Sequence, residues 1–351
     1  MEGKMKTKRA VTLTASLFLI PLLAVMLVAA LPSPTIAKTY ELSFATHVPP
    51  RAAPYAKAFL PWAKEIEKRT NGQLKIKFYL SQTLVKSRDS YDAVKNGVAD
   101  ISWIAYSLTP GRFPLASVME LPYLVKSTFA GAHVMTDLYK KFPEMRAEIK
   151  DVHLLWLWTT LPYELHTVKK PIHKLEDIKG MKLATQPGAI TVLKALGAVP
   201  VSMPSPEIYQ TVEKGVADGS ALAWGAFKAY RMVEVTNYHT NVHLAALPYA
   251  TIVNKNTWNK LPKDLQKVIT DVTNEMMPDT LCAAVSAELE IGKKGALDRN
   301  HPIYEIPAKE RARWVATGKP AYDKWVKDME AKGLPGRAIL DEAIRLMNAH
   351  P

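Results

Sequence analysis

Side chains that could hold a small organic molecule follow or lie within predicted strands: His47, Arg51, Trp103, Tyr106, Trp158 and Trp224. The aromatic rings could stack on a flat ligand. An imidazole, an arginine and the free N–H groups of a helix N-terminus could together hold an anion. Structural roles compete with these: Trp103 also suits a buried core, and Arg51 also suits the solvated first turn of a helix. The sequence therefore indicates a ligand site with both aromatic and anion-binding groups.

The motifs of common enzymes do not occur in this sequence. There is no Gly-x-Ser-x-Gly, no phosphate-binding glycine loop, no Gly-x-Gly-x-x-Gly and no His-Glu-x-x-His. The nine histidines have spacings that suit no compact metal site. We therefore expect a binding protein with no cofactor, metal or reaction. The enzyme alternative, an isomerase or lyase, would need an acid and base pair such as His47 and Glu164 facing one ligand atom.

A ten-residue repeat predicts the architecture. Tyr-Asp-Ala-Val-Lys-Asn-Gly-Val-Ala-Asp at residues 91–100 recurs 118 positions later as Tyr-Gln-Thr-Val-Glu-Lys-Gly-Val-Ala-Asp. Each copy is typical of a helix, a glycine that ends it and a buried strand. A second echo, between residues 42–47 and 181–186, comes earlier in each half. The sequence thus predicts two pseudo-repeated α/β lobes with a cleft between them.

The N-terminus has the features of a secretory signal peptide. Basic residues precede a long uncharged stretch that ends in Thr-Ile-Ala at residues 35–37. A retained membrane anchor is the alternative, because the apolar stretch approaches the ~20 residues of a spanning helix. The net charge is +13, but the basic residues are scattered among acidic ones, and we expect no nucleic-acid partner. The single cysteine, Cys282, excludes an internal disulfide.

The predicted organisation has four parts: a signal peptide at 1–37, the lobe 1 core at 38–160, the lobe 2 core at 161–260, and a helical segment at 261–351 that packs on both lobes. In the first lobe we expect strands at 40–45, 74–79 and 101–105 and a helix at 53–69. A buried strand at 153–160 should cross toward the second lobe. In the tail, residues 308–347 should form two helices separated by Gly-Leu-Pro-Gly at 333–336.

Several motifs, in order, resemble the extracytoplasmic solute-binding proteins of TRAP transporters. They include Leu-Pro-Tyr at 121–123, Glu-Asp-Ile-Lys-Gly-Met-Lys at 176–182, Lys-Gly-Val-Ala-Asp-Gly at 214–219 and Asn-Lys-Asn-Thr-Trp-Asn-Lys-Leu-Pro at 254–262. The resemblance covers essentially the whole chain after the signal peptide. It implies a periplasmic-binding-protein-like α/β fold, with two lobes, a hinge cleft and long C-terminal helices. It also implies a periplasmic protein that closes over a small ligand, hands it to membrane permease subunits and performs no reaction.

The sequence departs from this family at positions that bind the ligand. Members commonly carry an arginine for the ligand carboxylate where this chain has Ala184, and a second one near Glu164. A frequent asparagine is replaced by Leu222. The branch that binds oxo acids through a metal uses a Glu-Trp pair, of which only Trp224 remains here, after Ala223.

Two ligand hypotheses stay open. Either an organic acid binds, with Arg51 and His47 replacing the missing arginine, or the cleft takes a neutral aromatic molecule by stacking. An aromatic carboxylate would satisfy both, and Glu164 leaves room for a cationic ligand. A receptor that docks onto a membrane sensor is the alternative to a transport role. The candidate ligand-binding residues are His47, Arg51, Trp103, Tyr106, Trp158, Glu164, Ala184, Gln186, Ser205 and Trp224.

Overall fold

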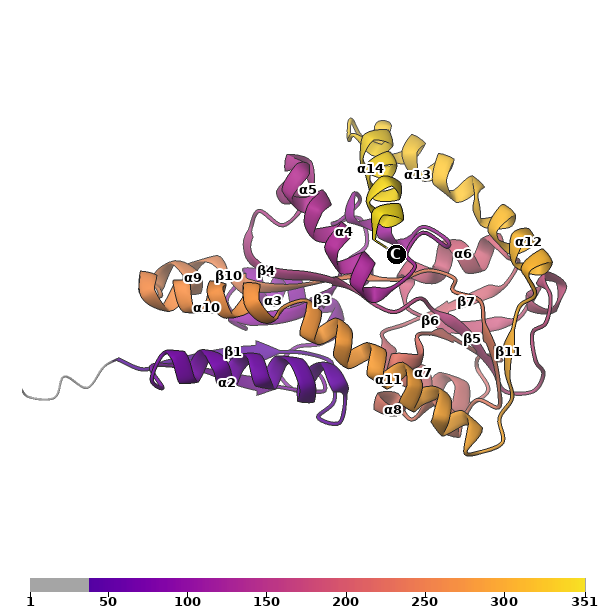
Figure 1. Cartoon of the computed structure of the whole chain (residues 1–351), viewed down its shortest axis with the longest axis horizontal. Helices are drawn as coiled ribbons and strands as arrows, with labels where there is room; N and C mark the ends of the chain where they lie inside the picture. The colour runs from indigo at the N-terminus through magenta and orange to yellow at the C-terminus, as the bar shows by residue number, and fades with distance from the viewer. Residues whose placement is uncertain (1–37, 351) are drawn as a thin grey trace, which may run out of the picture. The chain divides into compact units, whose positions relative to one another are not determined.

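The computed structural model describes residues 38–350, so the predicted signal peptide lies outside the described part. Within this range the strands form two sheets (Figure 1), of order β2-β1-β3-β10-β4 and β11-β9-β5-β8-β6-β7. The strands are β1 (Tyr40–Ala45), β2 (Leu74–Tyr79), β3 (Ile101–Ala105), β4 (Val152–Thr159), β5 (Glu164–Thr167), β6 (Lys182–Thr185), β7 (Val199–Ser202), β8 (Gly219–Leu222), β9 (Tyr238–Asn241), β10 (Pro248–Asn254) and β11 (Ile303–Glu305).

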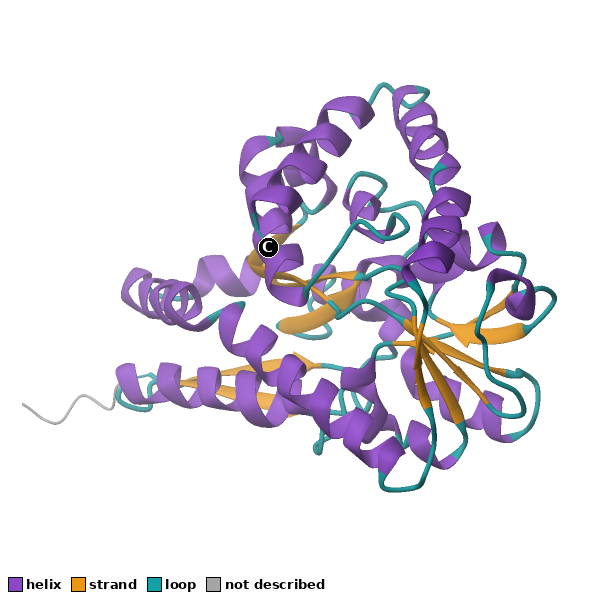
Figure 2. Ribbon diagram, turned by 45° about the vertical axis from the view of Figure 1, so that its right-hand side comes forward, coloured by secondary structure: helices purple, strands orange, loops and turns teal. Residues whose placement is uncertain are grey.

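Helices surround both sheets (Figure 2). They are α2 (Leu60–Arg69), α3 (Ser90–Lys95), α4 (Thr128–Lys141), α5 (Pro143–Glu148), α6 (Ile190–Ala195), α7 (Ser205–Glu213), α8 (Phe227–Tyr230), α9 (Lys255–Lys260), α10 (Lys263–Met276), α11 (Asp279–Leu297), α12 (Ala308–Gly318), α13 (Pro320–Glu330) and α14 (Gly336–Ala349). A π-helical turn, Pro54–Phe59, leads directly into α2. Among residues 38–350, no helix combines the length and the apolar character needed to cross a membrane.

Each sheet contains its own copy of the same three-stranded unit, as the sequence repeat predicts. In the first sheet β1 pairs in parallel with β2 and with β3, and in the second β6 pairs in parallel with β7 and with β8. The glycine after the repeated helix, Gly97 or Gly215, has a φ of 77° or 70°. Residues with a side chain rarely adopt this left-handed conformation, so glycine ends both helices. The predicted α/β fold with two pseudo-repeated lobes is confirmed. Below, lobe 1 is the first sheet and lobe 2 the second, each with its covering helices.

The aspartate that closes each repeat binds the backbone of the central strand. Asp100 Oδ2 accepts hydrogen bonds from the Ser43 N–H at 2.9 Å and from the Ser43 hydroxyl at 2.8 Å. Asp218 Oδ2 accepts one from the Lys182 N–H at 2.8 Å. Ser43 lies in β1 and Lys182 begins β6, so each carboxylate accepts hydrogen bonds from the central strand of its own lobe. The Thr257 hydroxyl donates a further bond to Asp100, at 2.7 Å.

Two segments cross between the lobes side by side. Residues 160–163 lead from β4 to β5, and residues 242–247 lead from β9 back to β10. The Thr160 N–H donates to the Leu247 carbonyl at 3.0 Å, and the Tyr163 N–H donates to the Ala245 carbonyl at 2.8 Å. The second crossing places β10 between β3 and β4. The predicted lobe 2 range, 161–260, therefore supplies one strand to the sheet of lobe 1.

The C-terminal part is helical, as predicted, but divided differently. Helix α11 packs against the π-helical turn and α4 in lobe 1 and against α8 in lobe 2; Figure 1 shows it running past both. After residue 308 the chain forms three helices rather than the two that the sequence predicts, because α12 ends at Gly318 and α13 begins at Pro320. Proline has no N–H to continue the hydrogen-bond ladder of the preceding helix.

Candidate functional site

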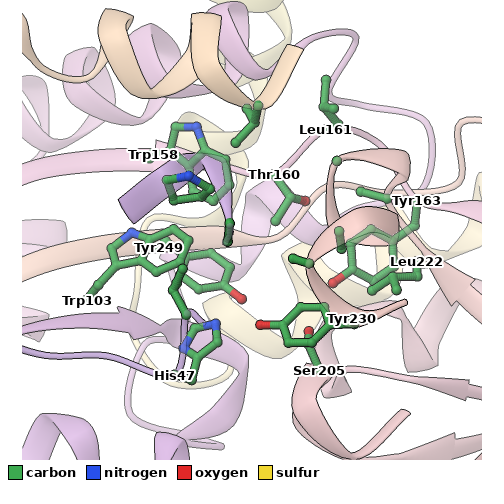
Figure 3. A pocket seen from close by; sticks show the side chains of 18 residues that line it. His47, Trp103, Trp158, Thr160, Leu161, Tyr163, Ser205, Leu222, Tyr230 and Tyr249 are labelled. Carbon is green, nitrogen blue, oxygen red and sulfur yellow. The ribbon is translucent and has the colours of Figure 1, made fainter. Parts of the chain in front are cut away.

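A cavity lies between the two lobes (Figure 3). A concave site between two lobes is a common place for a small-molecule ligand. Lobe 1 contributes residues from the end of β1 and from β3, β4 and β10, and lobe 2 contributes residues around β8, α7 and α8. Of the 18 described residues that line it, none is a lysine, arginine, aspartate or glutamate. The cavity is therefore lined by apolar, aromatic and uncharged polar groups.

Three aromatic side chains of lobe 1 form one wall of the cavity. Tyr249 on β10 pairs directly with Trp158 on β4 and with Ala105 on β3, and Trp103 lies two residues before Ala105. Directly paired residues, and residues two apart, point to the same face of a sheet. The ring centroids of Trp103 and Tyr249 are 4.6 Å apart, and those of Trp103 and Trp158 are 5.2 Å apart. The wall can pack against a flat apolar ligand.

His47 lies beside this wall, two residues after β1. Its ring is nearly parallel to Trp103, with an interplanar angle of 7° and a centroid distance of 5.3 Å. Only 6% of His47 is exposed, and Figure 3 shows the ring pointing into the cavity. Burial lowers the pKa of His47 to about 4, because desolvation disfavours the charged imidazolium. With no charged partner, His47 is therefore neutral at pH 7.

Gln186 positions two of the cavity's tyrosines from behind the lining. Its Oε1 accepts a hydrogen bond from the Tyr163 hydroxyl at 2.9 Å, and its Nε2 donates to the Tyr249 hydroxyl at 3.0 Å. Gln186 is fully buried. It follows β6 in lobe 2, and Tyr249 lies in lobe 1, so this amide also joins the two lobes. The sequence singled out Gln186, and the structure gives it an indirect place at the site.

Lobe 2 faces the aromatic wall with Tyr230 and Ser205. Tyr230 ends α8, and Figure 3 shows its hydroxyl pointing toward that of Tyr249. Burial raises the pKa of Tyr230, so it stays a neutral phenol. Ser205 begins α7 and also lines the cavity. Of the predicted candidates, the structure thus brings together His47, Trp103, Trp158 and Ser205 in the lining.

Arg51 lies at the rim rather than in the lining. It is exposed, and its Nε donates a hydrogen bond to the Ala229 carbonyl at 2.9 Å. Arg51 belongs to the turn after β1 in lobe 1, whereas Ala229 lies in α8 of lobe 2 and lines the cavity. The bond therefore joins the two lobes beside the cavity.

Two predicted aromatic contacts lie outside the lining. Tyr106 stacks on Phe113 at a centroid distance of 4.2 Å. Side chains alternate between the two faces of β3, so Tyr106, which directly follows this strand, lies on the opposite face from Trp103. Trp224 is buried, and its indole N–H donates to Asn241 Oδ1 at 2.8 Å. It begins a short helical turn after β8, and its ring packs on Phe227 at 4.6 Å.

Glu164 and Ala184 also lie outside the lining. The Glu164 carboxylate accepts a hydrogen bond from the His243 N–H at 2.8 Å and pairs with His243 Nδ1 at 2.6 Å, which raises the pKa of His243. Glu164 thus holds the second crossing segment. Ala184 is fully buried within β6, between β7 and β8.

Sequence reasoning missed four polar residues of the lining: Thr160, Tyr163, Tyr230 and Tyr249. Thr160 and Tyr163 belong to the first crossing segment, and Tyr249 begins the strand to which the second one leads. The strand pattern after residue 248 could have suggested a buried segment. It carries no sign that this strand returns to the first sheet and faces Trp158.

Comparison with known proteins identifies relatives along nearly the whole described chain. Residues 44–328 match the pattern of the bacterial extracellular solute-binding protein family 7. The C4-dicarboxylate-binding periplasmic protein DctP of Rhodobacter capsulatus is 28% identical over 317 residues, which cover 86% of this chain and 91% of that protein.

Two solved structures are similar in fold. A TRAP solute-binding protein from Rhodoferax ferrireducens T118, in complex with copurified benzoate, has a TM-score of 0.84 and 30% identity, covering 89% of this chain and 98% of the other. A marine metagenome TRAP solute-binding protein specific for aromatic acid ligands, with 3-hydroxybenzoate, also has a TM-score of 0.84. It is 27% identical, covering 89% of this chain and 99% of the other.

Proposed function

The chain belongs to the bacterial extracellular solute-binding protein family 7, and we propose that it captures an aromatic monocarboxylate in the cavity between its lobes. In this proposal it is the solute-binding component of a TRAP-type transporter in the periplasm. The bound acid is handed to membrane permease subunits, and no reaction takes place on it.

The observation that carries the proposal is the aromatic wall of Trp103, Trp158 and Tyr249 in a cavity without charged lining residues. Such a wall suits one flat ring, because ring faces pack well on each other and on apolar surface. A dicarboxylate or a sugar acid would leave several polar groups without partners in this lining, which is costly. The benzoate and 3-hydroxybenzoate bound by the two similar structures support the same class of ligand.

The location and the absence of a reaction rest on other observations. The predicted signal peptide supports export to the periplasm, and the family supports a permease partner. The acid and base pair considered above, His47 and Glu164, does not face one ligand atom, because Glu164 is paired with His243 and lies outside the lining. His47 remains as the one imidazole of the described lining.

A thermal-shift screen tests the proposal. Benzoate, 3-hydroxybenzoate and mandelate are compared with succinate, glucuronate and the neutral amide benzamide. A ligand at 100 times its dissociation constant stabilises the folded protein by about 2.7 kcal/mol, so the aromatic acids should raise Tm clearly. Stabilisation by succinate or glucuronate, with none by the aromatic acids, would contradict the proposal. Stabilisation by benzamide alone would instead support a neutral aromatic ligand.

Two tryptophan variants locate the binding. Trp103→Leu removes the central ring of the wall and should abolish most of the ligand-induced rise in Tm. Trp258→Leu is the matched control, because Trp258 stacks on His153 at a centroid distance of 3.8 Å and lies outside the cavity lining. An unchanged ligand response in Trp103→Leu would place the site elsewhere.

A further inference from the structure

We infer that His47 sets the charge of the ligand that the cavity accepts, by taking up one proton from solvent as a carboxylate enters. The acid is then held by an imidazolium and by the Tyr230 hydroxyl, without a lysine or arginine. This inference rests on the proposed function, because it requires a carboxylate to bind in this cavity.

The first step of the argument is the missing positive charge. None of the described lining residues carries one. The arginine at the rim, Arg51, lies outside the lining and donates its Nε to the Ala229 carbonyl of the other lobe; its charge acts on the Tyr230 phenol, where it opposes the rise in pKa that burial causes. A carboxylate that leaves water for an uncharged cavity loses strong solvation, which is regained only through a charged partner and hydrogen bonds. The site needs a group that can become positive.

The second step is the choice of group. The hydroxyls of Tyr163 and Tyr249 are bound to Gln186. In the described part of the chain, no protein hydrogen bond is formed by the His47 imidazole or by the Tyr230 hydroxyl. Both side chains point into the cavity (Figure 3), and His47 is more than nine-tenths buried. These two groups are therefore available to a ligand, and His47 is the one that can gain a positive charge near neutral pH.

The third step is the surroundings of His47. Its ring stacks on Trp103, and Tyr249 lies at a centroid distance of 6.1 Å. Across the cavity, lobe 2 presents the phenol of Tyr230. These groups are neutral at pH 7, and burial alone explains the lowered pKa of His47. A carboxylate in contact with the ring favours the imidazolium and raises this pKa.

The proton balance of the step is simple. The ligand enters as a carboxylate and stays one, a proton from solvent binds the neutral imidazole, and the filled cavity has no net charge. Because the free protein has a His47 pKa of about 4, nearly one proton is taken up per ligand at pH 6. Linkage then requires the affinity for the acid to fall about tenfold for each pH unit above 5, up to the pKa of the complex.

Isothermal titration calorimetry of the purified protein tests the inference. Benzoate is titrated at pH 6 in phosphate and in Bis-Tris, whose ionisation enthalpies differ, so the difference in measured heat gives the number of protons taken up. We expect nearly one proton for benzoate and none for benzamide, which has a similar shape but no charge. Repeating the benzoate titration at pH 5, 6 and 7 should show the tenfold steps in Kd.

Two histidine variants assign the proton. His47→Gln should lose the uptake and the pH dependence of benzoate binding while still binding benzamide. His153→Gln is the matched control: burial also lowers the pKa of His153 to about 4, and its ring also stacks on a tryptophan, but it lies outside the cavity lining. It should leave the uptake unchanged.

The outcomes separate the inference from the proposed function. Benzoate binding without proton uptake, or with full uptake in His47→Gln, overturns the inference and leaves the proposed function standing. No binding of benzoate, 3-hydroxybenzoate or mandelate between pH 5 and 7 overturns both. Should His47→Gln fail to fold, the comparison of benzoate with benzamide in the unaltered protein still decides whether a proton is taken up.

Discussion

Replacing Arg51 with glutamine should speed the release of bound ligand. The lining comes from both lobes, so separation of the lobes opens the cavity and releases the ligand. Separation breaks the 2.9 Å hydrogen bond from Arg51 Nε to the Ala229 carbonyl, because these residues belong to different lobes. Arg51 and Ala229 are 178 positions apart in the sequence, so no local element holds them together once the lobes part. The bond thus favours the closed form.

The expected size follows from the exposure of the bond. A hydrogen bond with a charged donor contributes about 1.5–3 kcal/mol when buried, and less when water competes. Arg51 is exposed, so we assign about 1 kcal/mol to it. That free energy corresponds to roughly a fivefold change in an equilibrium constant at 25 °C. Dissociation of benzoate from Arg51→Gln should therefore be about fivefold faster, while the rate of association should change little.

Stopped-flow fluorescence measures this rate, because Trp103 and Trp158 in the cavity wall report the loss of the ligand. Arg146→Gln is the matched control: Arg146 Nη1 also donates to backbone carbonyls, of Tyr139 at 2.8 Å and Lys140 at 2.6 Å, but entirely within lobe 1. The reasoning is refuted if Arg51→Gln releases benzoate at the unaltered rate, or if Arg146→Gln releases it equally fast.

Two further predictions concern stability. Asp100→Ala removes the acceptor of three hydrogen bonds and should lower the free energy of unfolding by about 3 kcal/mol. Asp218→Ala removes the acceptor of one hydrogen bond, on an exposed carboxylate, and should lower the free energy of unfolding by about 1 kcal/mol. Equal losses for the two variants in urea titrations would contradict this assignment. His153 has its pKa lowered to about 4 by burial, so below pH 6.5 the unfolded chain takes up a proton that the folded chain does not, and acid destabilises the fold. At pH 5 this proton uptake lowers the free energy of unfolding by about 2 kcal/mol. His153→Gln should therefore lose less stability than the unaltered protein between pH 7 and pH 5. Identical pH profiles of the two proteins in urea titrations would show that His153 is not the cause.

The sequence alone determined the repeated unit and much of the cavity's lobe 1 side. The predicted strands at 40–45, 74–79 and 101–105 coincide with β1, β2 and β3. Strand alternation and glycine at a left-handed turn are local properties, and both are visible in the order of residues. His47, Trp103 and Trp158 could be chosen for the same reason, since each follows or lies within a strand whose bounds are locally encoded.

The tertiary structure decided which residues complete the site. Tyr249 joins the wall because the chain crosses back from lobe 2 and inserts β10 between β3 and β4. Tyr230 and His47 face the same cavity although 183 positions separate them in the sequence. Trp224 was expected to contact the ligand but is turned inward, to a hydrogen bond with Asn241. The partners of a strand or a buried side chain depend on contacts between distant segments, and residue order near each position does not specify them.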